Sequence, residues 1–323
     1  MNMNQTNNKI VISIITPCYN AAPYIATTIK SVQQQTFTDW EMIVVDDGST
    51  DNSAHIVSEI AEIDSRIKLI QKENGGSASA RKLGLSLAQG KYIQFLDADD
   101  RLDKHKLQLQ ITLMEQQSLD VSYTDWCWIN MNGVTTPIKG LHCNLFRLLT
   151  IWGPFGTLPL HCFMYKIDFL RRNNINIPTH IKEREDWDFH IEVFSANPNY
   201  KRMKGYCGAM YTKAPTGKTT GATQEQIQIG TFRYLTYKIS QKQCYKKLLL
   251  QLRFSTELFY WLARSITYGA NKPLLSYYNF RNDTNFRKTL IIGTLLLPIS
   301  SIIAMTSSLN MRLRSRFYGI RKR

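Results

Sequence analysis

The stretch Lys91-Tyr92-Ile93-Gln94-Phe95-Leu96-Asp97-Ala98-Asp99-Asp100 decides how this chain of 323 residues folds. Four of the five residues from Tyr92 to Leu96 are apolar and Gly90 precedes them, a pattern typical of a strand buried on both faces of a sheet. Three carboxylates then crowd into its carboxyl end, where each raises the cost of ionising the next. A hard divalent cation, Mg²⁺ or Mn²⁺, would explain this cluster. The alternative is an acidic turn that caps the next helix through Asp100 or Asp103.

Three more strand-and-helix units come before this stretch. The sequence predicts strands at residues 10–16, 41–45 and 67–70, and helices at about residues 24–35, 51–64 and 77–89. Pro17 is expected to end the first strand. Four β-α units within about 100 residues predict a parallel α/β sheet with helices on both faces.

Polar groups follow several of these predicted strands. Asp46-Asp47 come after the second strand, the loop at residues 74–77 follows the third, and Asp97–Asp100 follow the fourth. Ligands bind outside the carboxyl ends of the strands in such sheets, so all three groups are expected at the binding edge. The Asn74-Gly75-Gly76 loop also precedes a helix and offers backbone N–H groups to a phosphate, although that signal is weak by itself.

The second half of the chain carries fewer signals. We expect a helix at about residues 103–117 and strands at about residues 120–130 and 203–211. The acidic cluster Glu183-Arg184-Glu185-Asp186-Trp187-Asp188 stands at the head of another helical pattern. Acids in a first helical turn complement the helix dipole and need no further role.

Two sets of residues in this half leave alternatives open. Tyr123, Trp126 and Trp128 either stack on a sugar ring or pack within their strand. The pairs His142-Cys143 and His161-Cys162 lack the close ligand spacing of a zinc site, so ordinary core or surface roles are expected for them.

The net charge of +15 is confined to the carboxyl-terminal part of the chain. Residues 226–323 hold 17 Lys and Arg against two acids, which leaves residues 1–225 with no net charge. This distribution favours a tail that meets an anionic membrane surface and argues against nucleic acid as a partner. Residues 289–311 carry no charge, but Gly293 and Pro298 favour an anchor in the membrane plane, or a re-entrant one, over a span.

These observations predict two domains, a catalytic domain at residues 1–220 and a helical, basic, membrane-associating region at residues 221–323. The six cysteines are scattered and the first eight residues are polar, without the apolar core of a signal peptide. We therefore expect a cytoplasmic protein that is peripheral on the inner face of the cell membrane.

Four motifs in this order and spacing carry a family resemblance. They are residues 12–20 (ISIITPCYN), 41–52 (EMIVVDDGSTDN), 74–81 (NGGSASAR) and 97–99 (DAD). Together they resemble the motif series of the family 2 inverting glycosyltransferases, over about residues 10–215. The resemblance implies the GT-A fold, a Rossmann-like, mostly parallel α/β sheet with flanking helices.

The resemblance also implies roles for seven residues. Pro17 and Tyr19 would border the nucleotide base, Asp47 would accept a hydrogen bond from a base N–H, and Arg81 would lie on the nucleotide side. Asp97 would contact the ribose, and Asp99 would hold the Mn²⁺ or Mg²⁺ ion on the donor's diphosphate. Asp186, with Glu185 as its neighbour, would take the proton from the acceptor hydroxyl.

The function implied is transfer of one sugar from a nucleotide-sugar donor, most simply a UDP-sugar, to a hydroxyl of a lipid-linked or surface glycan. One displacement would invert the anomeric centre. Two other classes remain open. A nucleotidyltransferase would share the sheet and the metal, but a basic glycine-rich loop would be expected after its first strand. A catalytically silent subunit that binds nucleotide or recruits a partner to the membrane would not need Asp99 and Asp186 together.

Overall fold

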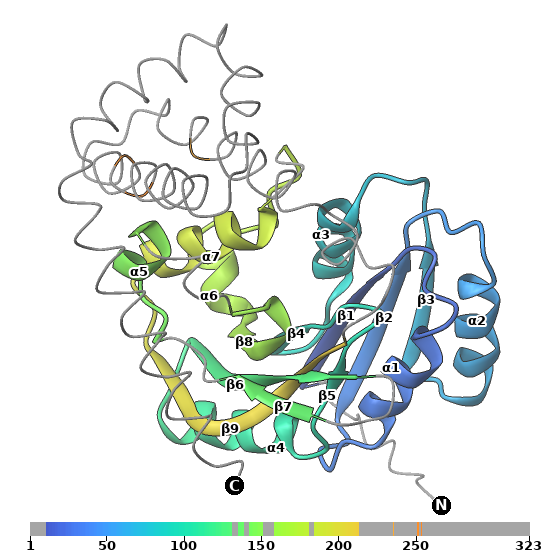
Figure 1. The fold of residues 1–323 in the computed structure, drawn as a ribbon, viewed down its shortest axis with the longest axis horizontal. Helices are drawn as coiled ribbons and strands as arrows, with labels where there is room; N and C mark the ends of the chain where they lie inside the picture. Colours follow the sequence, from blue (N-terminus) through green and yellow to red (C-terminus); the bar gives the residue numbers. More distant parts are fainter. Residues whose placement is uncertain are drawn as a thin grey trace, which may run out of the picture. The chain divides into compact units, whose positions relative to one another are not determined.

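The computed structural model describes residues 11–130, 135–138, 142–150, 158–180 and 184–212, together with Leu235, Gln251 and Arg253. The described strands form one sheet in the order β3-β2-β1-β4-β8-β6-β9-β5, with β7 paired to β6 and helices on both faces (Figure 1). The expected α/β class is confirmed.

Four parallel strands make up the amino-terminal half of the sheet, and helices α1 to α3 connect them. The strands are β1 (Ile12–Cys18), β2 (Trp40–Asp46), β3 (Ile67–Gln71) and β4 (Tyr92–Phe95). The helices are α1 (Ile25–Gln33), α2 (Ser53–Ile63) and α3 (Ser77–Leu87). Every residue of β2 and β4 is buried, as expected for apolar strands covered on both faces. The predicted bounds agree with these elements to within about two residues.

Alternate residues of the parallel strands face opposite layers of helices. Ile14 of β1 belongs to a core that also contains Ile29 of α1 and Val57 of α2. On the other face α3 packs on β1 and β2. A Cβ atom at Gly84 of α3 would come within 2.5 Å of the Ile15 side chain, so glycine is what lets α3 approach β1 this closely. This contact fixes the helix whose first two turns carry site residues.

Pro17 corrects one expectation, because β1 continues through it to Cys18. Pro17 pairs with Val45 of β2, whereas the pairing of β1 with β4 ends at Ile15, opposite Phe95. Beyond Ile15 the strand has one neighbour instead of two. Proline is tolerated in a strand where no ladder hydrogen bond has to be donated.

The other half of the sheet is mainly antiparallel, so the whole sheet is mixed rather than mostly parallel. β8 (Phe163–Lys166) runs antiparallel to β4 and to β6 (Val121–Ile129), and β7 (Thr135–Ile138) runs antiparallel to β6. β9 (Tyr200–Thr212) lies parallel to β6 and antiparallel to the short β5 (Arg101–Leu102). The sequence predicts β6 and β9 but not β5, β7 or β8.

Several helical segments flank this second half. They are α4 (Lys106–Gln116), the 3₁₀ turn η1 (Leu160–Cys162), α6 (Ile167–Arg172) and α7 (Glu185–Ser195). Helix α4 packs against β6, and η1 leads directly into β8. The Phe189 ring of α7 meets the rings of Phe95 and Tyr165 at 5.7 and 5.3 Å, which places α7 over β4 and β8. The predicted helices at 103–117 and at the 183–188 cluster are confirmed as α4 and α7.

The chain divides into two compact units, Met1–His142 with Leu158–Gly217, and Cys143–Thr157 with Lys218–Arg323. Helix α5 (Leu145–Thr150) belongs to the second unit, most of which lies outside the described residues. The domain division at residues 220 and 221 therefore stays a prediction. No helix in the described part of the chain has the length and hydropathy to cross a membrane, and residues 289–311 lie outside that part.

Candidate functional site

Asp47 lies at the carboxyl edge directly after β2, and its side chain is buried. Its Oδ1 accepts hydrogen bonds from Lys72 Nζ at 2.6 Å and from the Gly75 N–H at 3.0 Å, and its Oδ2 accepts the Gly76 N–H at 2.7 Å. The glycine N–H groups expected to be free for phosphate are therefore bound to Asp47. These bonds fix the orientation of the carboxylate, and Oδ2 keeps a lone pair for a further donor.

The loops after β1 and β2 lie beside each other. Asn20 Oδ1 accepts the Thr50 N–H at 2.8 Å and so ties the two loops together. Tyr19 in the first loop is 52% exposed, and Pro17 is partly buried. Pro17, Tyr19 and Asp47, the residues predicted to border a nucleotide base, thus occupy neighbouring ends of two parallel strands.

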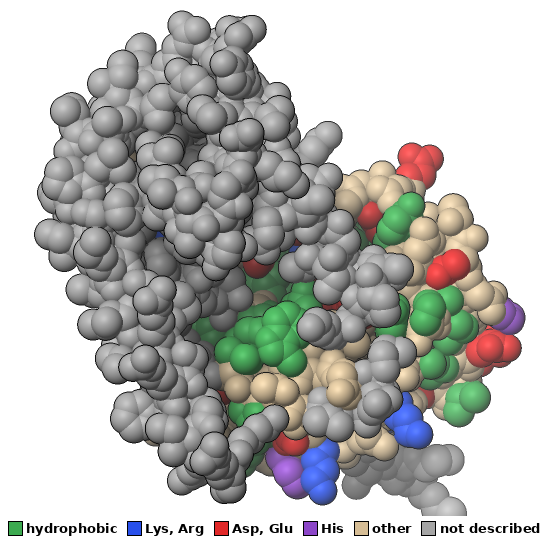
Figure 2. All heavy atoms as spheres, in the orientation of Figure 1, with side chains coloured by type: hydrophobic (Ala, Val, Ile, Leu, Met, Phe, Trp, Pro, Cys, Tyr) green, Lys and Arg blue, Asp and Glu red, His purple; other side chains and the backbone are tan. Residues whose placement is uncertain are grey.

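The acidic turn Asp97-Ala98-Asp99-Asp100 leaves β4 at the same edge. Burial, and then the charges of Asp100 and Asp97, raise the pKa of Asp99 to about 7. On the face drawn in Figure 2 the exposed acidic side chains stand singly among other residues. The crowding of carboxylates at the turn disfavours ionisation of Asp99 unless a cation or a hydrogen-bond donor offsets it.

Asp100 is buried and connects three segments of the fold. Its Oδ1 accepts the N–H of Thr212 at the end of β9 at 2.8 Å, and its Oδ2 lies 2.9 Å from Nδ1 of His161 in η1. Burial raises the pKa of the Asp100 carboxyl, and the His161 ring opposes that rise. Helix α4 begins only at Lys106 and has no side-chain cap. Asp100 therefore does not cap α4, whereas Asp103, the other residue of the capping alternative, accepts the His105 N–H at 3.0 Å just before the helix.

A candidate cation site lies at this turn. One ligand atom each from Asp97, Asp100 and His161 lies within 4.8 Å of the other two. Carboxylates suit Mg²⁺ and Mn²⁺, and imidazole is a common ligand of divalent transition metals. The Nε2 atom of His161 is buried and has no hydrogen-bond partner among the described residues. These donors fit a divalent cation; Asp99, the predicted metal ligand, lies in the same turn but outside this set.

Arg81 of α3 joins the acidic turn to the second acidic cluster. Its buried guanidinium donates from Nη2 to Asp97 Oδ1 at 2.6 Å and from Nη1 to Glu185 Oε1 at 3.4 Å. Ser77, one helical turn earlier, donates its hydroxyl to the same Glu185 oxygen at 2.8 Å. Burial lowers the pKa of Arg81, but the charges of Asp97 and Glu185 outweigh it and raise that pKa. Two clusters predicted separately thus meet at one guanidinium.

Asp186 follows Glu185 in the first turn of α7 and is partly buried. Its Oδ1 accepts the Trp187 N–H at 2.8 Å, which satisfies one of the unpaired N–H groups at the helix start. Burial, and then the charge of Glu185, raise the pKa of Asp186. A raised pKa suits a general base, so the capping and the catalytic reading are compatible for this carboxylate.

His161 is the residue of this site that the sequence analysis missed. It reaches the acidic turn from a single 3₁₀ turn 61 positions after Asp100, and no local pattern marks it. Its ring lies 5.8 Å from that of Tyr211, which in turn packs with Trp126 and Trp128 at 5.9 and 4.9 Å. His161 is thus buried beside the acidic turn, where the expected core role and a ligand role are compatible, and its neighbour Cys162 is buried as well.

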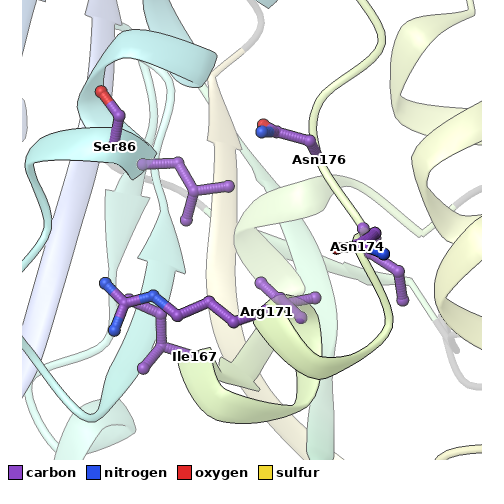
Figure 3. A pocket seen from close by; sticks show the side chains of 8 residues that line it. Ser86, Ile167, Arg171, Asn174 and Asn176 are labelled. Atoms are coloured by element: carbon purple, nitrogen blue, oxygen red, sulfur yellow. The ribbon is translucent and has the colours of Figure 1, made fainter.

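A groove of about 370 Å³ lies between α3 and α6 (Figure 3). It is lined by Leu85, Ser86, Ile167, Leu170, Arg171, Asn174, Ile175 and Asn176. Ser86 stands near the end of α3, whereas Ser77 and Arg81 stand in its first half. Ile167 follows Lys166, which pairs with Tyr92 at the amino end of β4. The groove is therefore at the edge of the sheet opposite to the acidic turn.

Comparison with known proteins identifies the family. The sequence profile described as "Glycosyl transferase family 2" matches residues 13–178. A putative teichuronic acid biosynthesis glycosyltransferase, TuaG of Bacillus subtilis, is 38% identical over 183 residues, which cover 56% of this chain and 71% of TuaG. The Escherichia coli enzyme WfgD, named as a UDP-Glc:alpha-D-GlcNAc-diphosphoundecaprenol beta-1,3-glucosyltransferase, is 42% identical over 125 residues, which cover 38% of this chain and 49% of WfgD.

Solved structures agree on the fold. Residues 1–349 of S. aureus TarS in complex with UDP have a TM-score of 0.63 at 21% identity, covering 93% of this chain and 88% of that one. The mannosyltransferase PcManGT of Pyrobaculum calidifontis in complex with GDP-Man and Mn²⁺ has a TM-score of 0.55 at 16% identity, covering 91% of this chain and 86% of that one. With the profile match, the TuaG relationship and the GT-A arrangement of the sheet, the chain belongs to glycosyl transferase family 2 and is a glycosyltransferase.

Proposed function

We propose that this glycosyltransferase moves a sugar from a nucleotide-sugar donor, most simply a UDP-sugar, to a hydroxyl of a lipid-linked or surface glycan. TarS has been crystallised with UDP and with UDP-GlcNAc, and WfgD is named for UDP-glucose. PcManGT binds GDP-Man, so the fold also serves other nucleotides. UDP is favoured because WfgD, at 42% identity, is named for a UDP-sugar, whereas PcManGT is only 16% identical to this chain.

The observation that carries the proposal is the position of Arg81. Its guanidinium contacts Asp97 of the acidic turn and Glu185 of α7 at the same time. The residues proposed for the donor, Asp97 and Asp99, therefore adjoin the one proposed for the acceptor, Asp186. Transfer between two substrates needs both groups within one site, because the reacting atoms must be held in contact.

The proposed reaction is a single displacement. Asp186 accepts the proton of the acceptor hydroxyl. The oxygen of that hydroxyl attacks the anomeric carbon of the donor sugar at the same time. The bond between that carbon and the diphosphate oxygen breaks, the nucleoside diphosphate leaves with the electron pair, and the configuration of the anomeric carbon inverts. The raised pKa of Asp186 serves this step, since a base is effective when its pKa lies near the working pH.

A divalent cation belongs to this proposal. Asp99 would hold it, and Asp97, Asp100 and His161 offer further ligand atoms around the same turn. When bound, such an ion supplies positive charge that stabilises the departing diphosphate. Asp47, held by the loop at residues 72–76, would present its remaining lone pair to the base N–H, between Pro17 and Tyr19.

The acceptor is proposed from relatives and from charge. TuaG is named for teichuronic acid biosynthesis and WfgD for a diphosphoundecaprenol-linked acceptor, both of which are surface polysaccharide chemistry. The basic region at residues 226–323 would hold the enzyme at an anionic membrane surface, where a lipid-linked acceptor is found. A peripheral position on the inner face of the cell membrane follows from this proposal.

Calorimetric titration of UDP, GDP and dTDP into the full chain, with and without Mn²⁺, tests the donor site. We expect UDP to bind most tightly, to bind more tightly with Mn²⁺, and to lose that metal dependence in Asp99→Ala. Preference for GDP or dTDP would overturn the UDP assignment alone. Absence of binding to the folded protein would overturn the proposed donor site, and a silent membrane-recruiting subunit would then be the better account.

A further inference from the structure

The buried side chain of Lys106, the first residue of α4, has no part in the proposed reaction. Lysine is almost never fully buried unless it is paired. Lys106 is nevertheless 0% exposed, and its two hydrogen bonds within the described part of the chain go to the neutral amide oxygens of Gln94 and Gln110. Burial lowers the pKa of Lys106 to about 7, which shows how unfavourable its charge is at this position. The two amides that Lys106 contacts show what its burial achieves.

Lys106 decides which way two glutamine amides face. Its amine presents donors to both Gln94 Oε1 and Gln110 Oε1, so the Nε2 ends of both amides must turn away from it. Gln94 Nε2 then donates to the carbonyl of Phe95 at 2.6 Å and to that of His161 at 3.0 Å. Gln110 Nε2 donates to Ser122 Oγ at 2.9 Å and lies 3.5 Å from the carbonyl of Cys162.

Both amides therefore contact backbone carbonyls of η1. A 3₁₀ turn of three residues has little hydrogen bonding of its own, and in η1 the Cys162 N–H bonds back to Pro159 O at 2.9 Å. The bonds from Gln94 and Gln110 anchor the carbonyls of the last two residues of this turn. One of those residues is His161, whose Nδ1 lies 2.9 Å from Asp100 Oδ2.

We propose that Lys106 is a positioning residue that, through Gln94 and Gln110, holds η1 so that the His161 ring stays at the acidic turn. The path runs from α4 through two amides to the backbone of η1, and from there to the imidazole beside Asp97 and Asp100. The role of that imidazole at the turn rests on the proposed function, whereas its position is a property of the fold alone.

The decisive measurement is the imidazole signal of His161 in ¹⁵N–¹H spectra of the full chain labelled at histidine. The chain has six histidines, and comparison with His161→Gln assigns the signal. Lys106→Met keeps the length of the side chain and removes the donors. We expect the His161 signal to shift or broaden in this variant while the signal of His55, in α2, stays in place; His105 directly precedes Lys106 and is left out of the comparison. An unmoved His161 signal would overturn the proposal.

A matched control separates positioning from general destabilisation. Glu41 is also buried, and it bonds Ser13 and Lys68 in a polar network of similar size near the amino ends of β1 and β2. Glu41→Gln should lower the melting temperature without moving the His161 signal. If Lys106→Met does not fold, Gln94→Met tests the same link, since it removes the amide bonded to His161 O and leaves Lys106 paired with Gln110.

A double-mutant cycle measures the consequence for metal and nucleotide. We expect Lys106→Met to weaken Mn²⁺-dependent UDP binding about tenfold, the usual effect of losing a residue that orients a metal ligand, and to leave metal-free UDP binding within about twofold. In the His161→Ala background Lys106→Met should have no further effect. Additive effects would mean that Lys106 acts by another route and would overturn the proposal. If the wild type shows no Mn²⁺-dependent UDP binding, the proposed donor site fails, and the His161 signal still decides the role of Lys106.

Discussion

A buried carboxylate, Glu41, and a partly buried one, Asp99, lie near opposite ends of the parallel strands and have opposite environments. Near the amino ends, Glu41 accepts hydrogen bonds from Ser13 at 2.6 Å, from Lys68 at 2.8 Å and from the Gln89 N–H at 2.9 Å. Burial raises its pKa, but these donors outweigh burial and hold the pKa of Glu41 below its ordinary value. At the carboxyl ends, burial and two neighbouring carboxylates raise the pKa of Asp99 to about 7.

This difference distinguishes a carboxylate that stabilises the fold from one that serves the site, within the same sheet. The donors around Glu41 come from the chain itself, so its charge is satisfied within the fold. Around Asp99, burial and the carboxylates of Asp100 and Asp97 raise the pKa more than a backbone hydrogen bond and the His161 ring lower it, so an added cation or donor would relieve the cluster. Substitution of Glu41 should therefore cost stability, and substitution of Asp99 should cost activity.

The largest expected effect comes from Asp99→Asn. Release of UDP from a UDP-sugar should fall about a thousandfold, because the charge that would hold the metal is lost. The free energy of unfolding should stay unchanged or rise, since one of three crowded carboxylates is neutralised. Urea denaturation beside a coupled assay for UDP release measures both quantities. Marked destabilisation with retained activity would reverse the comparison.

The second effect belongs to Glu41→Gln. Lys68 and the Ser13 hydroxyl lose a charged partner, which should lower the free energy of unfolding by about 2 kcal/mol; the partial exposure of Lys68 keeps this below the cost of breaking a fully buried pair. UDP release per folded molecule should stay within about twofold of wild type. Urea denaturation and the coupled assay again decide. A large loss of activity here would show that the amino edge also contributes to catalysis.

A third, smaller effect concerns Arg81, which links the two acidic clusters. Arg81→Lys keeps the charge but loses the planar fork that reaches Asp97 and Glu185 together, so kcat should fall about 10- to 100-fold. Arg66→Lys is the matched control. Arg66 likewise makes two guanidinium hydrogen bonds to carboxylate oxygens, but both go to Asp64 and lie at the surface away from this edge. Equal effects of the two substitutions would contradict a special role for Arg81.

The smallest effect is the pH dependence of the Glu41 contribution. A carboxyl whose pKa is lowered by folding stabilises the native state above its unfolded pKa, near 4.5, and loses that contribution as the pH falls through its folded value. The difference in unfolding free energy between wild type and Glu41→Gln should therefore shrink as the pH falls below 4.5. Urea denaturation at pH 7, 5 and 3.5 tests this sign. A constant difference would mean that the hydrogen bonds of Glu41 do not depend on its charge.

The parallel half of the fold could be predicted because each of its β-α units has a recognisable local sequence pattern. Apolar runs such as Met42–Val45 are bounded by acids and glycines, which marks each strand and the start of the helix after it. In the antiparallel half, the strand β8 lacks such residues at its ends. β8 passes from Lys166 into Ile167 of α6 without a turn residue, so neither element separates from the other in the sequence.

The candidate site divides in the same way. Residues that follow strands, such as Asp47 and Asp97, can be placed at the carboxyl edge from the sequence. The contact of Arg81 with Glu185 joins positions 104 apart, and His161 arrives from η1, so both depend on tertiary packing that no local pattern encodes. The bonds from Gly75 and Gly76 to Asp47 were hidden for another reason, since the pattern shows that N–H groups exist but not which acceptor takes them.

The hydrogen bond from the Thr212 N–H to Asp100 indicates where the junction of a hybrid between this enzyme and a relative should be placed. A hybrid enzyme that exchanges everything after Thr212 for the tail of a relative would keep β9 beside β6 and β5, and would keep the donor on Asp100 Oδ1. A junction placed before Tyr200 would instead import a foreign strand into the sheet. Exchange of the proposed membrane-associating region between relatives is therefore best attempted at the junction between Thr212 and Lys213.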